Sequence, residues 1–312
     1  MRSTCESFRK LVAVALVAVV ALVVAACGSD NGDKSSTSGS KTTMTTDSSL
    51  AAMVPAEVRD RGVLNIATIN FPPAAYRDPS GNLTGWEVEL GRGIGRALGL
   101  DVNFQVIDFA AVIPGLQAHK YDMAMGDILI DADRLKIVDM VATHEAFEAF
   151  GAPADSTLDL RSWLDVCGRK VAFLIGGHEV QDAQAAQREC KRAGKPAIDI
   201  QQYQSQPDVN LAMQSGRAEL TATDNDSISY VISQTGGRFK RVGRYGPSIL
   251  TGVAISKSAY SEQLARAVQA AVRQMIDDGS YEQIFREFNQ GLGGIPADLV
   301  QVNPTRTIFE EN

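Results

Sequence analysis

The stretch "YDMAMGDILIDADR", from Tyr121 to Arg134, decides the fold class because it reads as a buried strand that ends in charged residues. Methionine and isoleucine side chains give it the composition of a strand inside a sheet. Asp127 nevertheless lies within the apolar run, and Arg134 closes it just past two more acids. A buried, isolated carboxylate costs several kcal/mol unless it is paired. The end of this strand therefore needs a structural or a functional reason for its charges.

Strand-like and helix-like segments alternate along the rest of the chain. Short β-type runs occupy 63–69, 102–107, 171–175, 198–203 and 218–224. Apolar residues recur at helical spacing over 86–98 and 264–275, and again over 281–288 after the "DDGS" break. This order predicts an α/β fold with mainly parallel sheets in two units.

In open α/β sheets, ligands bind beyond the carboxyl ends of the strands. That rule directs attention to the residues that follow each predicted strand. They are Thr68 to Phe71 including Asn70, Asp108 and Phe109, Asp127 to Arg134 including Leu129, Gly176 to His178, and Thr223 to Asp226.

The N-terminus is predicted to be a sorting signal that takes no part in the fold. Arg2, Arg9 and Lys10 precede an apolar segment at 11–24, and small residues follow it. The run "VAAC" ending at Cys27 resembles the lipobox of bacterial lipoproteins, in which this cysteine carries the lipid and begins the mature chain. The alternative is an ordinary signal peptide with a chance cysteine. The resemblance implies a lipid-anchored, extracytoplasmic protein with a signal peptide at 1–26.

Residues 27–55 are predicted to be a flexible tether, because they are rich in Ser, Thr and Gly and have almost no large apolar residue. Without residues 1–26 the chain has 27 basic and 36 acidic side chains, a net charge of −9. An acidic body argues against nucleic acid or an anionic bilayer surface as the main partner. The 257 residues from Ala56 onward are enough for two domains.

Two cysteines remain in the predicted exported body, Cys167 and Cys190, with 22 residues between them. A disulfide is the expected pairing in an oxidising compartment, and it would contribute about 3 kcal/mol. Two buried free thiols are the alternative. Neither cysteine belongs to a CxxC pair or has a histidine at ligand spacing, so no zinc site is predicted.

Several motifs in a fixed order resemble the polar amino-acid family of extracytoplasmic solute-binding proteins, which are the capture components of ABC importers. They are "TGWEVEL", "DFAAVIPGLQAHKYDMAMGD", "DADRLKIVDM" and "NLAMQSGRAEL". The resemblance spans 63–288. It implies a type II periplasmic-binding-protein fold with two α/β lobes and two crossing strands as a hinge. Lobe 1 is expected at 56–146 plus 251–312 and lobe 2 at 147–250, with crossings near "EAFEAFG" and "YGPSILTG".

The resemblance also implies roles for individual residues. Arg134 matches the arginine that binds the ligand α-carboxylate, and a planar guanidinium suits two carboxylate oxygens. Asp224 matches the aspartate that holds the α-ammonium, although it is also placed to cap a helix. Phe71 and Phe109 match aromatic residues beside the ligand side chain, with core packing as the alternative. An amino-acid-like ligand, permease partners and a monomer are expected, with no cofactor.

The sequence also departs from the family pattern. Asp127 and Leu129 stand where a serine or threonine hydroxyl is usual, and "IGGHE" replaces a T-G-T or S-G-T-x-S run. These changes argue against a plain α-amino acid and led to the hypothesis that Asp127 holds a cationic group of the ligand. A structural ion pair or a turn cap are the alternatives for Asp127. His178 is expected either to hydrogen-bond the ligand or to lie solvated in a loop.

Other activities find little support in the sequence. The run "GRGIGRALG" from Gly91 lies within a predicted helix and lacks the spacing of a dinucleotide loop. Neither a Walker A run nor a G-x-S-x-G elbow is present. Two alternatives to a binding protein remain: a dehydratase-like enzyme that uses Asp127 or Glu179 as its acid, and a ligand-sensing receptor module.

Overall fold

The computed structural model describes residues 48–288, 294–305 and 308–309. Its helices are α1 (Ser48–Met53), α2 (Ala56–Arg61), α3 (Trp86–Leu98), α4 (Val112–Gln117), α5 (Ala132–Ile137), α6 (His178–Arg192), α7 (Gln206–Gln214), α8 (Asn225–Gln234), α9 (Ser261–Asp277) and α10 (Ser280–Glu287). Its strands are β1 (Val63–Thr68), β2 (Tyr76–Arg77), β3 (Leu83–Thr84), β4 (Asp101–Val106), β5 (Met123–Leu129), β6 (Val138–Pro153), β7 (Lys170–Leu174), β8 (Asp199–Tyr203), β9 (Leu220–Asp224), β10 (Phe239–Ser256) and β11 (Ile308–Phe309). Short 3-10 turns occupy Phe109–Ala111, Trp163–Val166 and Ala297–Leu299.

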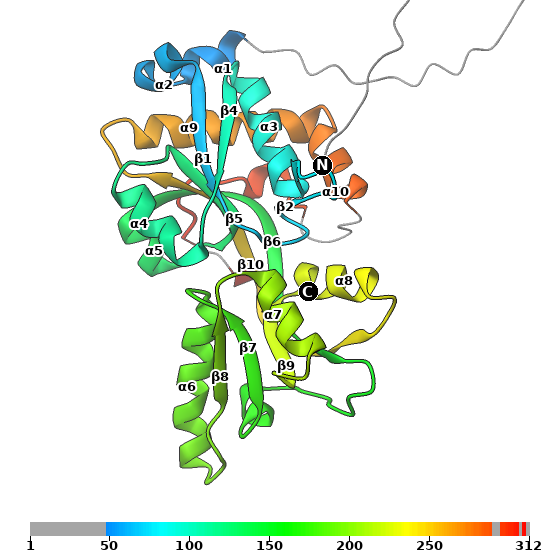
Figure 1. Ribbon diagram of the computed structural model, residues 1–312. Coiled ribbons are helices and arrows are strands. Elements are labelled where there is room, and N and C mark those ends of the chain that lie inside the picture. Colours follow the sequence, from blue (N-terminus) through cyan, green and yellow to red (C-terminus); the bar gives the residue numbers. More distant parts are fainter. Residues whose placement is uncertain (1–47, 289–293, 306–307, 310–312) are drawn as a thin grey trace, which may run out of the picture. The chain divides into compact units, whose positions relative to one another are not determined.

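One sheet runs through both halves of this body, in the order β4-β1-β5-β10-β6-β9-β7-β8, with β11 beside β10 (Figure 1). The outer strands are parallel, namely β4, β1 and β5 in one half and β9, β7 and β8 in the other. The two central strands, β6 and β10, are antiparallel to each other and are the longest in the molecule's described part.

These two long strands join two hydrophobic cores. Lobe 1 here denotes the part built on β1, β4 and β5 with α3, α9 and α10, and lobe 2 the part built on β7, β8 and β9 with α6, α7 and α8 (Figure 1). In lobe 1, Thr251 of β10 lies opposite Leu129 of β5. In lobe 2, Glu148 of β6 lies opposite Asp224 of β9. The predicted α/β fold with two lobes joined by two crossing strands is confirmed.

The strand that opened the sequence analysis is buried as expected. Every residue of β5 except Asp127 is buried, because β1 and β10 pair with its edges and helices of lobe 1 cover it.

The C-terminal segment of the chain returns to lobe 1 and packs beside β6. Ala142 of β6 donates a backbone hydrogen bond to the carbonyl of Gln301 at 2.9 Å, and Asn303 lies beside Met140.

The glycines of "GRGIGRALG" serve close packing. A Cβ atom on Gly91 would collide with the Phe104 ring of β4, and one on Gly95 would collide with Val102. On Gly93 it would meet Met275 of α9. The glycines therefore let α3 approach β4 and α9 closely, which explains this run without a nucleotide.

The predicted tether ends too late at residue 55. Ser48–Met53 form α1, and Leu50 and Val54 are buried in the core of lobe 1. Leu50, Met53 and Val54 are large apolar residues at the end of an otherwise polar segment, and Met53 also packs against this core. The predicted signal peptide, Cys27 and residues 28–47 lie outside the described residues. Among the helices that the structure describes, none has the length and apolarity needed to cross a membrane.

Cys167 and Cys190 form the predicted disulfide, which joins the end of a 3-10 turn to α6 in lobe 2. Cys190 is fully buried and packs in the lobe 2 core with Val166 and Ala186. The bridge closes a loop with a sequence separation of 23, which restricts the unfolded chain.

Removing this bridge with the double variant Cys167→Ser/Cys190→Ser is expected to lower the free energy of unfolding by about 3 kcal/mol. Urea unfolding of the protein without residues 1–26, with and without reductant, measures the effect. Reductant should destabilise the wild type by a similar amount and leave the variant unchanged. An unaltered urea midpoint in the variant would show that the bridge adds no stability.

Candidate functional site

One cavity, which is partly open to solvent, is lined by residues of both lobes and of the crossing strands. Its lining combines aromatic and aliphatic side chains with one arginine, one histidine and three carboxylates. The lining residues are Phe71, Phe109, Gly126, Asp127, Leu129, Arg134, Ala146, Glu148, Leu174, Gly177, His178, Glu179 and Thr251. Most of the residues predicted to contact a ligand are therefore brought together.

Arg134 is held in place by the strand end and the first turn of α5. Asp131 caps that helix by accepting hydrogen bonds from the backbone N–H groups of Asp133 and Arg134. Nη1 of Arg134 donates to the carbonyl of Leu129 at 2.7 Å, and the guanidinium lies 5.9 Å from the centroid of the Phe109 ring. No described residue accepts a hydrogen bond from Nη2 of Arg134. Burial lowers the pKa of this guanidinium, which indicates a charge that is poorly solvated.

Asp127 has a partner within lobe 1, which was one of the alternatives considered from the sequence. Its Oδ1 lies 2.8 Å from Nε2 of His144, and both side chains are almost completely buried. The backbone of Asp127 has φ of +52°, a conformation that is uncommon outside glycine. Its backbone N–H donates to both carboxyl oxygens of Glu87, at 3.0 and 3.1 Å. Asp127 is thus structurally paired and also lines the cavity.

Glu87 is a buried carboxyl with an unusual environment. Only 1% of it is exposed, in the first turn of α3. Burial, and secondarily the charge of Asp127, raise the pKa of Glu87 to about 8. Its role is to fix the backbone of Asp127, so that the strand end adopts a left-handed conformation with no glycine.

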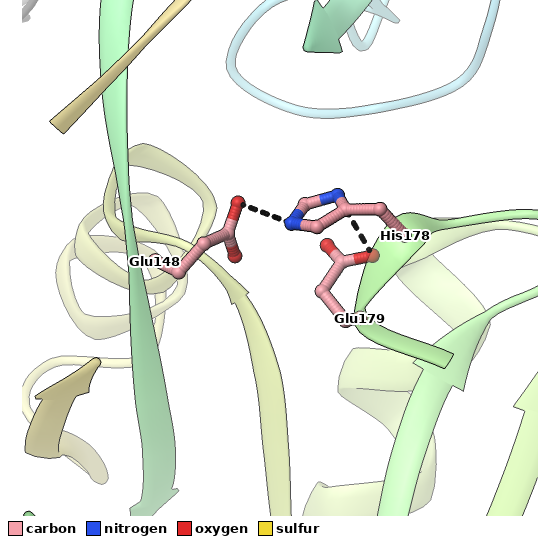
Figure 2. Close-up of side chains that lie close together, drawn as sticks. All are labelled: Glu148, His178 and Glu179. Carbon is pink, nitrogen blue, oxygen red and sulfur yellow. Dashed lines mark ion pairs between the residues drawn. The ribbon is translucent and has the colours of Figure 1, made fainter. Parts of the chain in front are cut away.

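Glu148, His178 and Glu179 form a second charged group, which we call the EHE cluster (Figure 2). His178 does not lie in a solvated loop, as one alternative had it: it begins α6, and its side chain is 24% exposed. Its Nε2 lies 3.2 Å from Oε1 of Glu148, and its Nδ1 lies 3.6 Å from Oε2 of Glu179. Tyr245 donates its hydroxyl to Oε2 of Glu148 at 3.2 Å.

The charges within the EHE cluster shift one another. Burial alone would lower the pKa of His178, but the neighbouring Glu179 and Glu148 carboxylates outweigh it and raise that pKa. Burial raises the pKa of Glu179, and the nearby His178 charge opposes this rise. The EHE cluster thus contains two carboxylates and one imidazole, all of them largely shielded from solvent.

Asp224 ends β9 and caps α8, because its Oδ1 accepts from the Ser227 N–H at 2.8 Å. It is not among the described residues that line the cavity, but it lies directly opposite Glu148 on the adjacent strand. Burial, and then the charges of Asp127, Asp226 and Glu148, raise its pKa well above the ordinary value. Burial and the charge of Asp127 also raise the pKa of Asp226, to about 7.

The two aromatic residues combine both roles considered for them. Phe71 is 6% exposed and belongs to the lobe 1 core, and Phe109 packs against that core; both also line the cavity. Asn70 instead lines a neighbouring cavity with Tyr76 and Tyr230. Gly176 lies next to the lining residue Gly177, in a backbone conformation with φ of +86° and close to Ala110.

The sequence reasoning missed Glu87, His144 and Glu148 as site residues. A signal existed for two of them. His144, Ala146 and Glu148 alternate along β6, so a crossing strand that passes a cavity presents them on one face. Glu87 lies inside a quoted motif, but nothing in the sequence indicates that its carboxyl faces the backbone of residue 127.

Comparison with known proteins agrees with this geometry. The sequence matches the family model of bacterial extracellular solute-binding proteins, family 3, over residues 64–291. The chain belongs to this family.

The chain is also similar to proteins named for different amino acids. The arginine-binding protein ArgT of Corynebacterium glutamicum is 26% identical over 260 residues, covering 82% of this chain and 83% of that protein. The L-cystine-binding protein TcyJ of Escherichia coli is 22% identical over 231 residues, covering 73% and 83%. A solved structure of an ancestral arginine-binding protein bound to arginine has a TM-score of 0.66 and 28% identity, covering 73% of this chain and 98% of that one.

The buried carboxyl of Glu87 gives a testable dependence of stability on pH. In the folded protein it keeps its proton up to about pH 8, whereas in the unfolded chain it ionises near its ordinary value of 4.5. The stability that protonated Glu87 contributes is therefore fully present below pH 4.5 and is lost as the pH rises toward 8. The Glu87→Gln variant keeps an acceptor for the Asp127 N–H. Between these pH values its free energy of unfolding is expected to fall by a few kcal/mol less than that of the wild type.

Urea unfolding at pH 5 and pH 8 measures the difference between Glu87→Gln and the wild type. Glu89→Gln, on the same helix but partly exposed, is the matched control and should behave as the wild type does. If the wild type and Glu87→Gln lose the same stability between the two pH values, Glu87 is not protonated in the folded protein.

Proposed function

We propose that this chain is the lipid-anchored capture component of an ABC importer and that its ligand is a cationic amino acid of the arginine type. The observation that carries the proposal is the charge pattern of one cavity, whose lining contains the guanidinium of Arg134, the imidazole of His178 and three carboxylates. An amino acid with a positively charged side chain has the complementary pattern, with one negative and two positive groups.

Arg134 is the proposed site for the α-carboxylate of the ligand. The Leu129 carbonyl and the Phe109 ring already fix the plane of its guanidinium, so little side-chain entropy is lost on binding. Nη2 has no acceptor among the described residues and is available to a carboxylate oxygen. A charge-assisted hydrogen bond in a poorly solvated place is among the stronger polar contacts that proteins make.

The positive groups of the ligand are proposed to face the carboxylates. Asp127 lines the cavity, and Asp224 lies opposite Glu148 on the adjacent strand. Arg134 has an ion-pair partner of its own, because its Nε lies 3.5 Å from Oδ2 of Asp131. After burial, the charge of Asp127 is the next largest cause that raises the pKa values of Asp224 and Asp226, so a bound cation would relieve repulsion as well as form new ion pairs. Phe71 and Phe109 offer ring faces to the aliphatic stem and to a guanidinium.

Two of the compared proteins support the choice of an arginine-type ligand. ArgT is named for arginine binding, and the ancestral protein was solved with arginine bound. The identities are 26% and 28%, and TcyJ, named for L-cystine, is similar to the chain as well. The proposal therefore rests first on the charges in the cavity and second on these names.

Capture is proposed to work through domain closure. The ligand would contact Arg134 on lobe 1 and Glu179 on lobe 2, and contacts that exist only in the closed form shift the equilibrium toward it. The strands β6 and β10 are the proposed hinge, since they alone among the described strands pair within both lobes. The closed form would then be recognised by the permease subunits, with the protein acting as a monomer.

Anchoring through Cys27, cleavage after residue 26 and a tether starting there remain proposals that rest on the lipobox-like sequence. We also infer that the protein releases its ligand chemically unchanged. Mass spectrometry of small molecules released by denaturing the freshly purified protein addresses both ligand identity and conversion. Recovery of an altered mass after incubation with a captured amino acid would favour an enzyme on the same scaffold.

Arg134→Ala is expected to weaken arginine binding by roughly 100-fold or more, because it leaves the ligand carboxylate buried without a partner. Isothermal titration calorimetry at neutral pH measures the affinity. Arg266→Ala, which removes an exposed arginine of α9 that pairs with Glu262, is the matched control and should bind as the wild type does. Wild-type affinity in Arg134→Ala would exclude the proposed role of this guanidinium.

A further inference from the structure

The EHE cluster, made of Glu148, His178 and Glu179, has a feature that the proposed amino-acid capture leaves unexplained. It places an imidazole between two carboxylates in the wall of the cavity (Figure 2). We propose that Glu148, His178 and Glu179 form a binding site for a divalent transition-metal ion of the Zn²⁺ type.

The distances fit such an ion. One donor atom from each residue lies within 4.8 Å of the other two. Nε2 of His178 and Oε1 of Glu148 are 3.2 Å apart, which is close to the roughly 3.3 Å expected for two donors about 2 Å from a tetrahedral ion. Glu179 follows His178 in the first turn of α6, and its Oε2 lies 3.6 Å from Nδ1 of the same imidazole.

Two atoms of the cluster have charged neighbours but no well-aligned hydrogen bond among the described residues. Nε2 of His178 and Oε2 of Glu179 have almost no accessible surface, and they lie 3.2 Å from Oε1 of Glu148 and 3.6 Å from Nδ1 of His178, respectively. Glu148 is 5% exposed. Buried polar atoms in proteins are nearly always satisfied, and leaving one unpaired costs about 1–3 kcal/mol. A metal ion between these atoms would remove that cost, because each would become a ligand.

The surroundings of Glu148 also suit a metal ligand. The Tyr245 hydroxyl donates to Oε2 of Glu148, which orients the carboxylate and leaves Oε1 facing His178. Hydrogen bonds of this kind hold ligating carboxylates in place in metal sites. An imidazole with two carboxylates is a mixed nitrogen and oxygen donor set, which favours first-row transition metals over Ca²⁺ or Mg²⁺.

The proposed site is built from one side of the cavity. His178 and Glu179 belong to α6 of lobe 2, and Glu148 lies where β6 pairs with β9 of the same lobe. Its formation therefore does not require the ligand or lobe 1. Three protein donors leave one coordination position, which faces the cavity that all three residues line. The inference does not depend on the proposed function, because the metal is measured without any amino acid present.

Sequence analysis predicted no metal site, because it looked for ligands at short spacings. Glu148 precedes His178 by 30 positions and reaches it only because β6 crosses into lobe 2 beside β9. The pairing of a crossing strand with the start of α6 is a property of the topology, which no local motif encodes.

The test is a titration of tag-free, EDTA-treated and dialysed protein with ZnCl₂, followed by calorimetry. One equivalent is expected to bind. His178→Ala and Glu148→Gln should each weaken binding at least tenfold, since each removes one of three donors. His119→Ala, in which the lost imidazole contacts Ser256 elsewhere in lobe 1, is the matched control and should bind as the wild type does. Absence of Zn²⁺ binding, or equal binding by His178→Ala, would overturn the proposal.

Two further measurements separate this proposal from others. X-ray absorption at the zinc edge of the wild type should show one imidazole with oxygen donors, and several imidazoles or any sulfur would contradict the assignment even if a variant failed to fold. Arg134→Ala should lose arginine capture but keep the metal. Loss of Zn²⁺ in that variant, with its fold verified by circular dichroism, would contradict a site confined to Glu148, His178 and Glu179.

Discussion

The excess of buried carboxylates over buried cations is the constraint on which the site depends. Glu87, Glu148 and Asp224 are each at most 5% exposed, and Asp127 is nearly as buried. Burying unpaired charge is far more costly than any single hydrogen bond repays. Burial raises the pKa values of Glu87 and Asp226, which favours their uncharged forms, and local pairs such as Asp127 with His144 offset part of the remaining cost. A cationic ligand would supply the remaining balance.

The backbone places these charges with little freedom. The carboxyl end of β5 delivers Asp127 and Leu129 to the cavity, and the capped turn of α5 delivers Arg134. The left-handed conformation of Asp127 persists because Glu87 accepts its N–H, which links the first turn of α3 to the strand end. On the other side, β6 carries Glu148 to the start of α6. The charged residues that line the cavity thus lie at or near the ends of β5, α5 and α6 or on the crossing strand β6.

The α/β class was predictable because hydrophobic periodicity depends on local sequence, whereas the two crossing strands between the lobes were implied by the family resemblance. Composition predicted the burial of β5, and apolar spacing predicted the C-terminal helices α9 and α10. The disulfide was predicted because only two cysteines follow Cys27. The predicted tether failed at Leu50, Met53 and Val54, because three large apolar residues are too few to stand out at the end of a polar segment.

The site was less predictable, because its partners are distant in sequence. Arg134 and Asp127 stood out as charges at the end of an apolar strand, and the cavity contains both. His144 and Glu148 did not stand out, because their positions depend on the course of β6, which crosses between the lobes and pairs with β9. Asp224 shows the same limit: its cap on α8 was foreseeable from the sequence, whereas its position opposite Glu148 comes from the pairing of β6 with β9.

The most direct measurement compares the affinities of arginine and citrulline, which share a shape but differ in side-chain charge. Calorimetric titration of the ligand-free exported body at neutral pH provides both values. If the carboxylates of the cavity select a cation, arginine should bind about 100-fold tighter or more, because the neutral ureido group leaves those acids unpaired. Equal affinity for the two ligands would contradict the account.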